Sequence, residues 1–561
     1  MNNKTKQIIV VVSVFVIALA SLGTVIGLLV STGRLSEYSG GFSYTLSGTR
    51  ATITGYDGDD TDVVVPDKVR GNRVVSIAKD AFSTKAGNIK TITIKTTSTA
   101  FSLESEAFKD MTALEEVVLP LGLKEIPAGA FSGCKALRDI VIPDSVTLIG
   151  EKAFYNCSSL KFSFSRENYS DEEENSIDKE IFYMPSGLLE IGANAFENCT
   201  ALIGAHFNKA LEKVGDEAFY RATAFTELTF DEDCELASIG NSAFQSTRLR
   251  SNANELLEFP HLTTIGDKAF ADITTNFTQF KFPATIKSVG ANAFMNNTSL
   301  ATVHFAEGVE LETMGEGVFQ DCTYLSTIEL PESIKEIPAK AFMGCTRLLY
   351  NSDFKIGKNV EKIGEGAFAI YTNNATYSRR AITVDNENQN FAILTLQNFS
   401  KTNSSSSYEH GLLTNADHTV VYAYFGSYDK TSYFGSKINV GSDEEKADKR
   451  FKFYNEGGNQ ITSINEIKSY AFAGVAFEDM RLPKTVTVLG EYLFYESDDF
   501  STAYIESIKW TWQKTTFNKE SDGSPEVEIL ILVSTEATDS EISDFISSLA
   551  ADEIYSGRAN L

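Results

Sequence analysis

Apolar residues return along this chain at a fixed long period, which no single helix or strand produces. The repeated unit is a hexapeptide, Ile-Gly-x-x-Ala-Phe, which reads cleanly at 149–154, 191–196 and 265–270 and more loosely elsewhere. A period of this length predicts a solenoid, in which no repeat buries its own apolar face and neighbouring repeats stack into one core. The phenylalanine of the hexapeptide occurs fourteen times, usually 23 to 26 residues apart: at 82, 108, 131, 154, 196, 219, 244, 270, 294, 319, 342, 368, 472 and 494.

One repeat, residues 137–160, indicates how each coil of the solenoid is built. Apolar side chains alternate with polar or mixed ones over 137–142, which predicts a short half-buried strand. Pro143 follows and ends the strand, because proline has no N–H to donate to a neighbouring strand. Most of the eleven prolines of the chain stand at such strand ends: 66, 120, 143, 185, 260, 283, 331 and 483.

The second half of the repeat returns to the core at Ile149. Gly150 is expected to make the turn that follows, and residues 151–157 are predicted to form a turn or two of helix. Phe154 and Cys157 then share one face of this helix, because they are three residues apart.

The ordered recurrence of strand, proline, glycine, Ala-Phe pair and cysteine resembles the BspA-like leucine-rich repeat family over roughly residues 50–494. The segments 51–56, 62–66 and 75–77 resemble the usual opening of that family. The resemblance implies a repeat solenoid, a leucine-rich-repeat right-handed superhelix with short parallel strands on one face and short helices or turns on the other. It also implies a bacterial surface protein, since many members are linked to adhesion to host matrix proteins or cells.

Two long spacings interrupt the array. The step from Phe154 to Phe196 contains the acidic run 170–180, and the step from Phe368 to Phe472 contains residues 411–422, which predict two strands around an Asn-Ala-Asp turn. This pair resembles the hairpin insertion common in the family.

The resulting boundaries place the solenoid at 41–494, with the hairpin-type insertion at about 379–460. Residues 495–561 are interpreted as a C-terminal cap, because solenoid ends need a polar cover. Within this cap we expect strands at 505–512 and 527–533 and an amphipathic helix at 540–550.

The N-terminus predicts a membrane anchor. Residues 8–30 contain no charge, and as a helix they span roughly 35 Å, enough to cross a hydrocarbon core of about 30 Å. Residues 1–7 form the cytoplasmic N-terminus and 31–40 a linker, since Lys4 and Lys6 hold the N-terminus inside and leave the repeats outside. The alternative is a signal peptide cleaved after Ala20, which would release a secreted protein.

The formal net charge of −27 bears on the choice of partner. It argues against nucleic acid and anionic membrane surfaces, because both require positive patches. It suits basic or cation-bridged partners, or it serves only to keep the solenoid soluble and monomeric.

A cysteine stands three residues after the phenylalanine in five repeats, at 134, 157, 199, 322 and 345. Other repeats carry Met111, Ala222, Thr247, Ile273 or Val475 there, so the position is interpreted as a packing slot in which free cysteine acts as a small hydrophobe. Disulfides between neighbouring coils (134 with 157, 322 with 345) are the alternative, because coils stack about 4.8 Å apart, within bridging range.

Motifs for catalysis or metal binding are absent from the sequence. It has five histidines and no G-x-S-x-G, H-E-x-x-H, Cys-x-x-Cys or phosphate-binding glycine loop. Acidic clusters at 57–62 and 171–174 lack the spacing of a calcium loop and are expected to be solvated. We therefore expect no enzyme activity, no cofactor and no metal site.

The outward residues of the predicted strands form one long surface, because side chains alternate between the two faces of a strand. It is polar, mixed and mostly acidic, which suits a protein or glycan ligand but is also the ordinary composition of an exposed sheet face. The candidate ligand contacts are Glu116, Asp139, His206, Glu227, Lys281, His304, Glu329 and Arg481, with Thr229, Gln279, Thr302 and Asp479 beside them.

The sequence thus predicts a membrane-anchored extracellular solenoid that binds other macromolecules, with adhesion to host matrix or cells as the role that the resemblance implies. Three alternatives stay open. In the first, the array is a structural scaffold of the cell envelope without a soluble ligand. In the second, the protein is a secreted decoy or inhibitor. In the third, residues 369–466 or the C-terminal tail form a catalytic module whose catalytic residues the sequence does not reveal.

Overall fold

A computed structural model describes most of the repeat array. The predicted anchor at 8–30 and the acidic run at 170–180 lie outside the described residues, and no helix within the described part is long and apolar enough to cross a membrane. The chain divides into two compact units, residues 1–249 and 250–561. The described residues are 37–161, 182–251, 257–348, 354–370, 382–396, 411–425, 451–453, 459–475, 479–497, 502–505 and 528–531, with four positions between 540 and 547.

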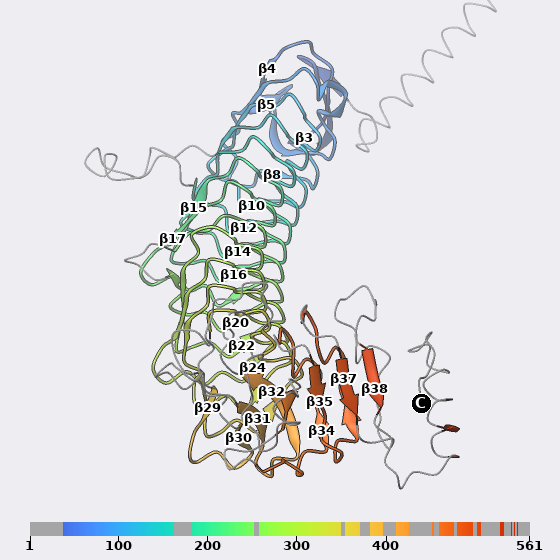
Figure 1. The fold of residues 1–561 in the computed structure, drawn as a ribbon. Helices are drawn as coiled ribbons and strands as arrows, with labels where there is room; N and C mark the ends of the chain where they lie inside the picture. Colours follow the sequence, from blue (N-terminus) through green and yellow to red (C-terminus); the bar gives the residue numbers. More distant parts are fainter. Residues whose placement is uncertain are drawn as a thin grey trace, which may run out of the picture. The chain divides into compact units, whose positions relative to one another are not determined.

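The first unit opens with a small sheet and continues as stacked coils (Figure 1). The opening sheet contains β1 (Glu37–Ser39), β2 (Phe42–Ser47), β3 (Arg50–Tyr56), β5 (Lys68–Val69), β6 (Asn72–Ile77) and β8 (Ser102–Leu103). A short 3-10 helix, η1 (Ser83–Lys85), follows the first hexapeptide.

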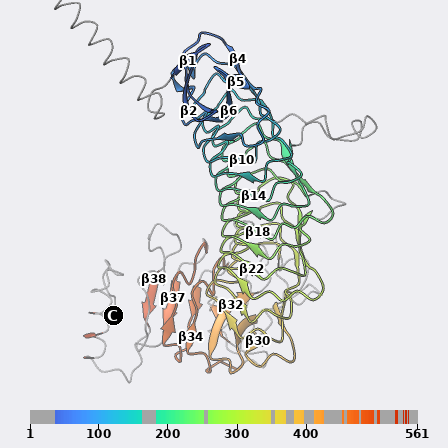
Figure 2. The ribbon, with the colours of Figure 1, turned by 180° about the vertical axis from the view of Figure 1, so that it is seen from behind.

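Each coil of the first unit contributes to two parallel ladders. The first ladder holds the predicted strands: β4 (Asp62–Val65), β7 (Thr91–Ile94), β9 (Glu116–Val118) and β11 (Asp139–Val141), then β13 (Phe182–Tyr183), β15 (Gly204–Phe207) and β17 (Glu227–Phe230). The second ladder, marked in Figure 2 by β10, β14 and β18, was not predicted: β10 (Glu125–Ile126), β12 (Leu148–Ile149), β14 (Glu190–Ile191), β16 (Lys213–Val214) and β18 (Ser238–Ile239). Each of its strands is the pair of residues before the hexapeptide glycine, or before Pro127 in β10. A two-residue segment is too short to show alternation in the sequence.

The second unit repeats this arrangement. Its first ladder contains β19 (Leu257–Glu258), β21 (Gln279–Phe282), β23 (Thr302–Phe305) and β25 (Thr327–Ile328), and then the pair β27 (Phe354–Ile356) and β29 (Ile382–Val384). Its second ladder contains β20 (Thr264–Ile265), β22 (Ser288–Val289) and β24 (Thr313–Met314), and then the pair β26 (Glu336–Ile337) and β28 (Lys362–Ile363).

The segment between the second ladder and the cysteine slot is a run of tight turns, so the predicted helix over 151–157 is wrong. Lys152 and Asn156 have φ angles of 55° and 59°, which a right-handed helix does not allow. The N–H of Phe154 donates to the carbonyl oxygen of Ala195 in the next coil (2.8 Å), and the intervening N–H groups close turns three residues back. Half of the N–H groups therefore join coils, whereas a helix would use them internally.

The hexapeptide glycine begins a turn, as predicted, since the carbonyl oxygen of Gly150 accepts a hydrogen bond from the N–H of Ala153 at 3.2 Å. The glycine also permits close contact between coils, which the sequence did not reveal. Gly150 is not among the residues with positive φ. A Cβ atom on Gly150 would lie 2.8 Å from the backbone nitrogen of Ala128 in the preceding coil, and one on Gly215 would lie 2.7 Å from that of Ala193. Backbone atoms that are hydrogen-bonded in a ladder cannot move away from an added Cβ, so a larger side chain at these positions would clash with them.

The hexapeptide phenylalanines form a continuous buried column in each unit. In the first unit the rings from Phe82 to Phe244 stack with centroids 5.1–5.5 Å apart. In the second, the rings from Phe270 to Phe368 stack 5.4–5.8 Å apart. These separations lie within the favourable range for stacked aromatic pairs, so each ring is held by the rings of both neighbouring coils.

The cysteine slot provides a hydrogen-bond donor as well as apolar volume. In all five repeats that carry it, the Sγ–H donates to the phenylalanine carbonyl of the preceding coil at 3.0–3.1 Å, as Cys157 does to Phe131. Asn297 and Ser497 occupy the same slot and donate to the equivalent carbonyl at 2.8 and 3.2 Å. The interpretation as a packing slot was therefore incomplete. All six cysteines are buried and free.

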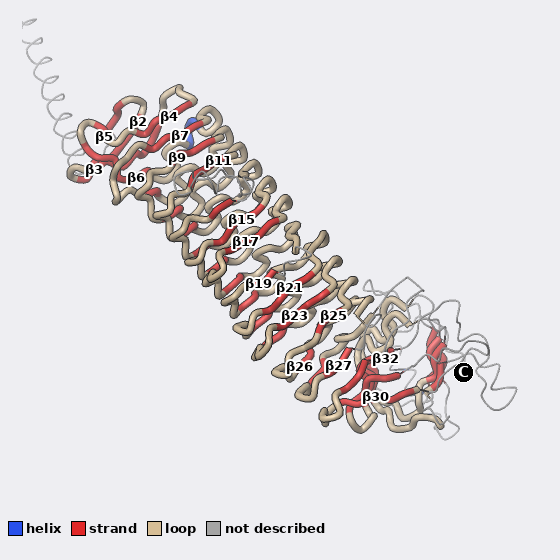
Figure 3. Tube along the Cα trace, turned by 90° about the vertical axis from the view of Figure 1, so that its left-hand side faces the viewer, coloured by secondary structure: helices blue, strands red, loops and turns tan. Residues whose placement is uncertain are grey.

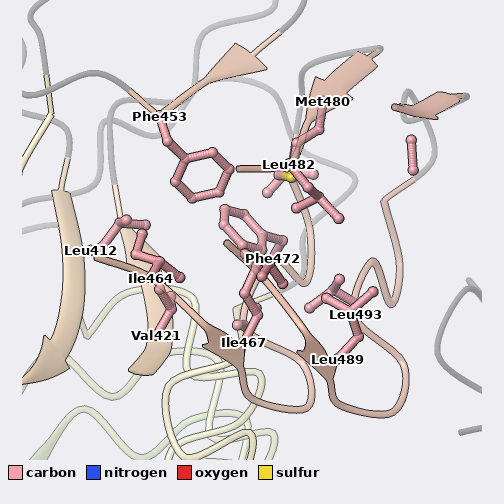
Figure 4. Close-up of a cluster of buried hydrophobic side chains, with 14 of the residues drawn as sticks. Leu412, Val421, Phe453, Ile464, Ile467, Phe472, Met480, Leu482, Leu489 and Leu493 are labelled. Atoms are coloured by element: carbon pink, nitrogen blue, oxygen red, sulfur yellow. The ribbon is translucent and has the colours of Figure 1, made fainter. Parts of the chain in front are cut away.

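The predicted hairpin insertion is part of the core. Its two strands pair antiparallel as β31 (Gly411–Asn415) and β32 (Val420–Phe425), and β30 (Phe391–Thr395) adds a third strand. β32 then pairs parallel with β34 (Glu466–Ile467), which is followed by β36 (Val488–Leu489). Figure 4 shows Leu412 and Val421 of the hairpin packed with Ile467 and Phe472 of the next coil. Tyr424 stacks on Phe472 at 5.8 Å and so replaces a phenylalanine of the column.

Strand stacking continues beyond the last hexapeptide. β33 (Phe451–Lys452), β35 (Asp479–Arg481), β37 (Thr502–Ile505) and β38 (Glu528–Ile531) form one parallel sheet. β37 overlaps the predicted range 505–512 at Ile505, and the rest of that range lies outside the described residues. β38 lies within the predicted range 527–533. The four described positions between 540 and 547 are helical, inside the predicted helix.

We expect Gly215→Ala to destabilise the protein, because its Cβ would meet fixed backbone atoms 2.7–3.0 Å away. Overpacking of this kind costs about 1–3 kcal/mol, which urea denaturation of the variant would measure. Gly87→Ala is the matched control, because no atom lies within 4 Å of its Cβ position and its φ is not positive. Equal stability of the two variants would contradict the close approach of the coils.

We expect the six thiols to resist iodoacetamide in the folded protein at pH 8 and to react fully after unfolding without reductant. Burial raises the pKa of Cys134 to about 12 and raises the pKa of Cys157 and Cys345, so the reactive thiolate is scarce. Because these thiols ionise first in the unfolded chain, the free energy of unfolding should fall as the pH rises above about 8.5. Fewer than six reactive thiols after unfolding would indicate a disulfide.

Candidate binding surface on the strand face

The first-ladder strands lie side by side on successive coils (Figure 3). Their outward positions form in-register rows that cross the coils. In the first unit, one row contains Asp62, Thr91, Glu116 and Asp139, which are direct partners on β4, β7, β9 and β11. Parallel pairing in register places like positions about 4.8 Å apart. The structure therefore brings the predicted residues Glu116 and Asp139 next to each other.

The acidic side chains of this row are not neutralised by neighbouring cations. Asp62 accepts a hydrogen bond from the Thr91 hydroxyl at 2.7 Å, and no ion pair involves Asp62, Glu116 or Asp139 among the described residues. The Oδ1 atom of Asp139 is buried without a hydrogen-bond partner. A buried carboxylate oxygen without a donor costs free energy, so this position is not occupied by aspartate for stability.

The positions two residues further along these strands form a second row that the sequence analysis missed. It contains Val64, Thr93, Val118 and Val141, again as direct register partners. The three valines are 46, 43 and 36% exposed. The alternation along each strand in the sequence already indicates that these positions point outward. Their side chains are mostly apolar, so they were not among the polar residues predicted to contact a ligand.

A histidine-centred group occupies the strand face at β15 and β17. His206 is half-buried between Tyr183, whose ring centroid lies 4.9 Å away, and Thr229, whose hydroxyl lies 2.9 Å from Nδ1. Its Nε2 lies 3.1 Å from the Asp231 carboxylate. Glu227 is not part of this group, because it pairs in register with Gly204.

In the second unit, the strand face carries a mixed row. Lys281 on β21 is the register partner of His304 on β23, and both follow a neighbouring outward pair, Gln279 and Thr302. His304 is exposed, and so is Glu329, which directly follows β25. Here the structure brings Lys281 and His304 together as adjacent residues.

Two predicted candidates lie apart from these rows. Arg481 is on β35, in the sheet formed with β33, β37 and β38, and so is not adjacent to Lys281 or His304 in any described sheet. His206 lies in the first unit and His304 in the second. The eight predicted residues therefore do not form one site, and only Glu116 with Asp139 and Lys281 with His304 are register partners.

Charged groups on the turn face are mutually paired. Glu106 forms ion pairs with both Lys109 and Lys79, and the hydrogen bonds from these two ammonium groups lower its pKa to about 2. In the opening loop, Asp59 pairs with Lys85 and Asp60 accepts a hydrogen bond from Tyr56 at 2.7 Å. The described part of the chain contains no cluster of histidine, cysteine and acidic residues that could hold a metal ion.

Comparison with known proteins identifies the family. The model of the BspA type leucine-rich repeat region matches residues 75–184, 174–256, 263–388 and 450–525, which together cover more than half of the chain. This chain is a BspA-type leucine-rich repeat protein. No curated protein matches it.

Several solved structures are similar to this BspA-type protein at low sequence identity. A leucine-rich repeat protein from Bacteroides ovatus is 22% identical in sequence to this chain. The alignment covers 59% of this chain and 91% of the Bacteroides chain, with a TM-score of 0.37. A leucine-rich cell surface protein from Faecalibacterium prausnitzii is 23% identical, with coverages of 63% and 95% and a TM-score of 0.36. The pneumococcal vaccine antigen PcpA is 16% identical, with coverages of 91% and 96% and a TM-score of 0.39.

Proposed function

We propose that this protein is an extracellular, membrane-anchored binding protein that holds a macromolecular ligand on its strand face and performs no catalysis. The anchor is residues 8–30, and the ligand is a protein or a glycan on a host matrix or another cell. Membership of the BspA-type family supports a surface role of this kind, as the resemblance noted from the sequence already implied.

The observation that carries the proposal is the contrast between the two faces of the first-ladder strands. Inward positions vary in size, from Ala205 to Phe280, but stay apolar and buried because each faces the core. Outward positions change from an acidic row beside valines to a histidine group and then to a Lys281–His304 pair. Stacking does not require this variety, and a surface of varied chemistry on a rigid scaffold suits ligand recognition.

The test is binding of the purified full-length chain to immobilised matrix proteins and to whole cells, compared with a charge-reversed variant. The variant replaces Glu116, Asp139, Glu227 and Glu329 by lysine. Since charge complementarity favours some partners and like charges oppose them, we expect binding by the native chain and at least a tenfold loss in the variant.

The matched control reverses Glu125, Glu212, Glu312 and Glu336, four exposed acidic residues at or beside the second ladder. It changes the net charge by the same amount and should bind as the native chain does. Equal loss in both variants would indicate a general charge effect, and no binding by the native chain to any matrix protein or cell would refute the adhesive role.

A further inference from the structure

The valine row on the first unit is an exposed apolar stripe. Val64, Thr93, Val118 and Val141 lie on four adjacent strands in register, so they span about 14 Å at the usual strand spacing. The valines are 46, 43 and 36% exposed, and they are three of the seven most exposed large hydrophobic residues within the described part of the chain. Apolar side chains gathered on one exposed face favour the docking of another molecule, although this row is short and is interrupted by Thr93.

The fold itself does not require valine at these positions. Thr93 stands in the middle of the row and pairs normally with both neighbouring strands, so a polar β-branched residue is accommodated. Strand propensity favours valine in general, yet equivalent outward positions of other described strands carry different residues: Tyr183, His206, Thr229, Lys281 and His304. Among the described first-ladder strands, exposed valines at this position occur on β4, β9 and β11.

The row beside the stripe supplies unpaired negative charge. Asp62, Glu116 and Asp139 lie two residues before the corresponding valines, about 7 Å away along each strand. None of the three forms an ion pair within the described residues. Glu115 does not add to this charge, because Lys90 and Arg138 pair with it.

We propose that this two-row surface docks a protein segment that carries a row of apolar side chains beside a row of lysines or arginines. The inference rests on the proposed binding function and assigns it a place and a partner chemistry. The apolar row of the partner covers the valines, and its cations face the carboxylates of Asp62, Glu116 and Asp139. The net charge of −27 favours approach of such a basic partner.

The probe is a fluorescent 14-residue helical peptide of leucine and lysine with all leucines on one face, titrated against the full-length chain by anisotropy. We expect saturable binding that weakens about tenfold in Val118→Thr/Val141→Thr, since loss of apolar contact at two sites approaches the 1.4 kcal/mol that a tenfold change represents. Glu116→Gln/Asp139→Asn should weaken binding at low salt and flatten its salt dependence.

Three controls make the result specific. Val488→Thr removes an exposed valine of the second unit (38% exposed) and should bind as the native chain does. A scrambled peptide of the same composition and a leucine–glutamate peptide should both bind at least tenfold more weakly. Thermal unfolding confirms that each variant is folded, and the Glu116→Gln/Asp139→Asn pair tests the surface without changing any apolar contact.

Unchanged peptide affinity in both double variants, equal binding of the scrambled peptide, or no binding of the leucine–lysine peptide would overturn the assignment. The cell and matrix assay separates this outcome from failure of the proposed function. A partner that binds the native chain and Val118→Thr/Val141→Thr equally would leave the function intact and refute the stripe. Absence of any cell or matrix partner refutes the adhesive function, whereas the peptide titration still decides whether the stripe docks a basic segment.

Discussion

The structure depends on one constraint, the hydrogen bonding of every coil to the next at strand spacing. In the strands, this hydrogen bonding is ordinary parallel pairing. In the turns, it requires backbone conformations with positive φ angles. Alternate residues there must direct their N–H groups to the neighbouring coil, as Phe154 does to Ala195, so residues such as Lys152 and Asn156 take left-handed φ angles. That geometry costs about 1 kcal/mol or more for a residue other than glycine, and the repeated inter-coil bonds offset it.

The other repeated features follow from this spacing. Position 215 is glycine because the backbone of the preceding coil lies against it. The phenylalanine rings stack because the backbones that carry them are stacked at strand spacing. Cys157 and Ser497 each donate a hydrogen bond to the phenylalanine carbonyl of the preceding coil. Interruptions are tolerated where they restore the same contacts. The hairpin insertion does this by placing β32 in the second ladder and Tyr424 against Phe472.

The same constraint separates stability from recognition. Inward side chains are held to one apolar pattern by contact with both neighbouring coils, whereas outward side chains on the first ladder contact only nearby surface residues, such as Thr229 and Asp231 around His206. A row such as Val64, Thr93, Val118 and Val141 can therefore differ from the row at Lys281 and His304 with no change in the fold. The binding surface can therefore change one coil at a time, because a substitution at an outward position alters the surface of its own coil and leaves the core of the solenoid unchanged.

The sequence by itself determined the solenoid, the strand side of each coil, the hairpin and the family, because these depend on a periodic contrast between apolar and polar positions that recurs in every repeat. It did not reveal the second ladder, whose strands are two residues long, or the turns at 151–157, whose apolar spacing also fits a helix. Only the tertiary structure showed why Gly150 is small and why the slot of Cys157 favours a donor, since both depend on atoms of the preceding coil. The grouping of surface residues was likewise settled in three dimensions, because register alone decides that Glu116 meets Asp139 while His206 meets Thr229 and not Glu227.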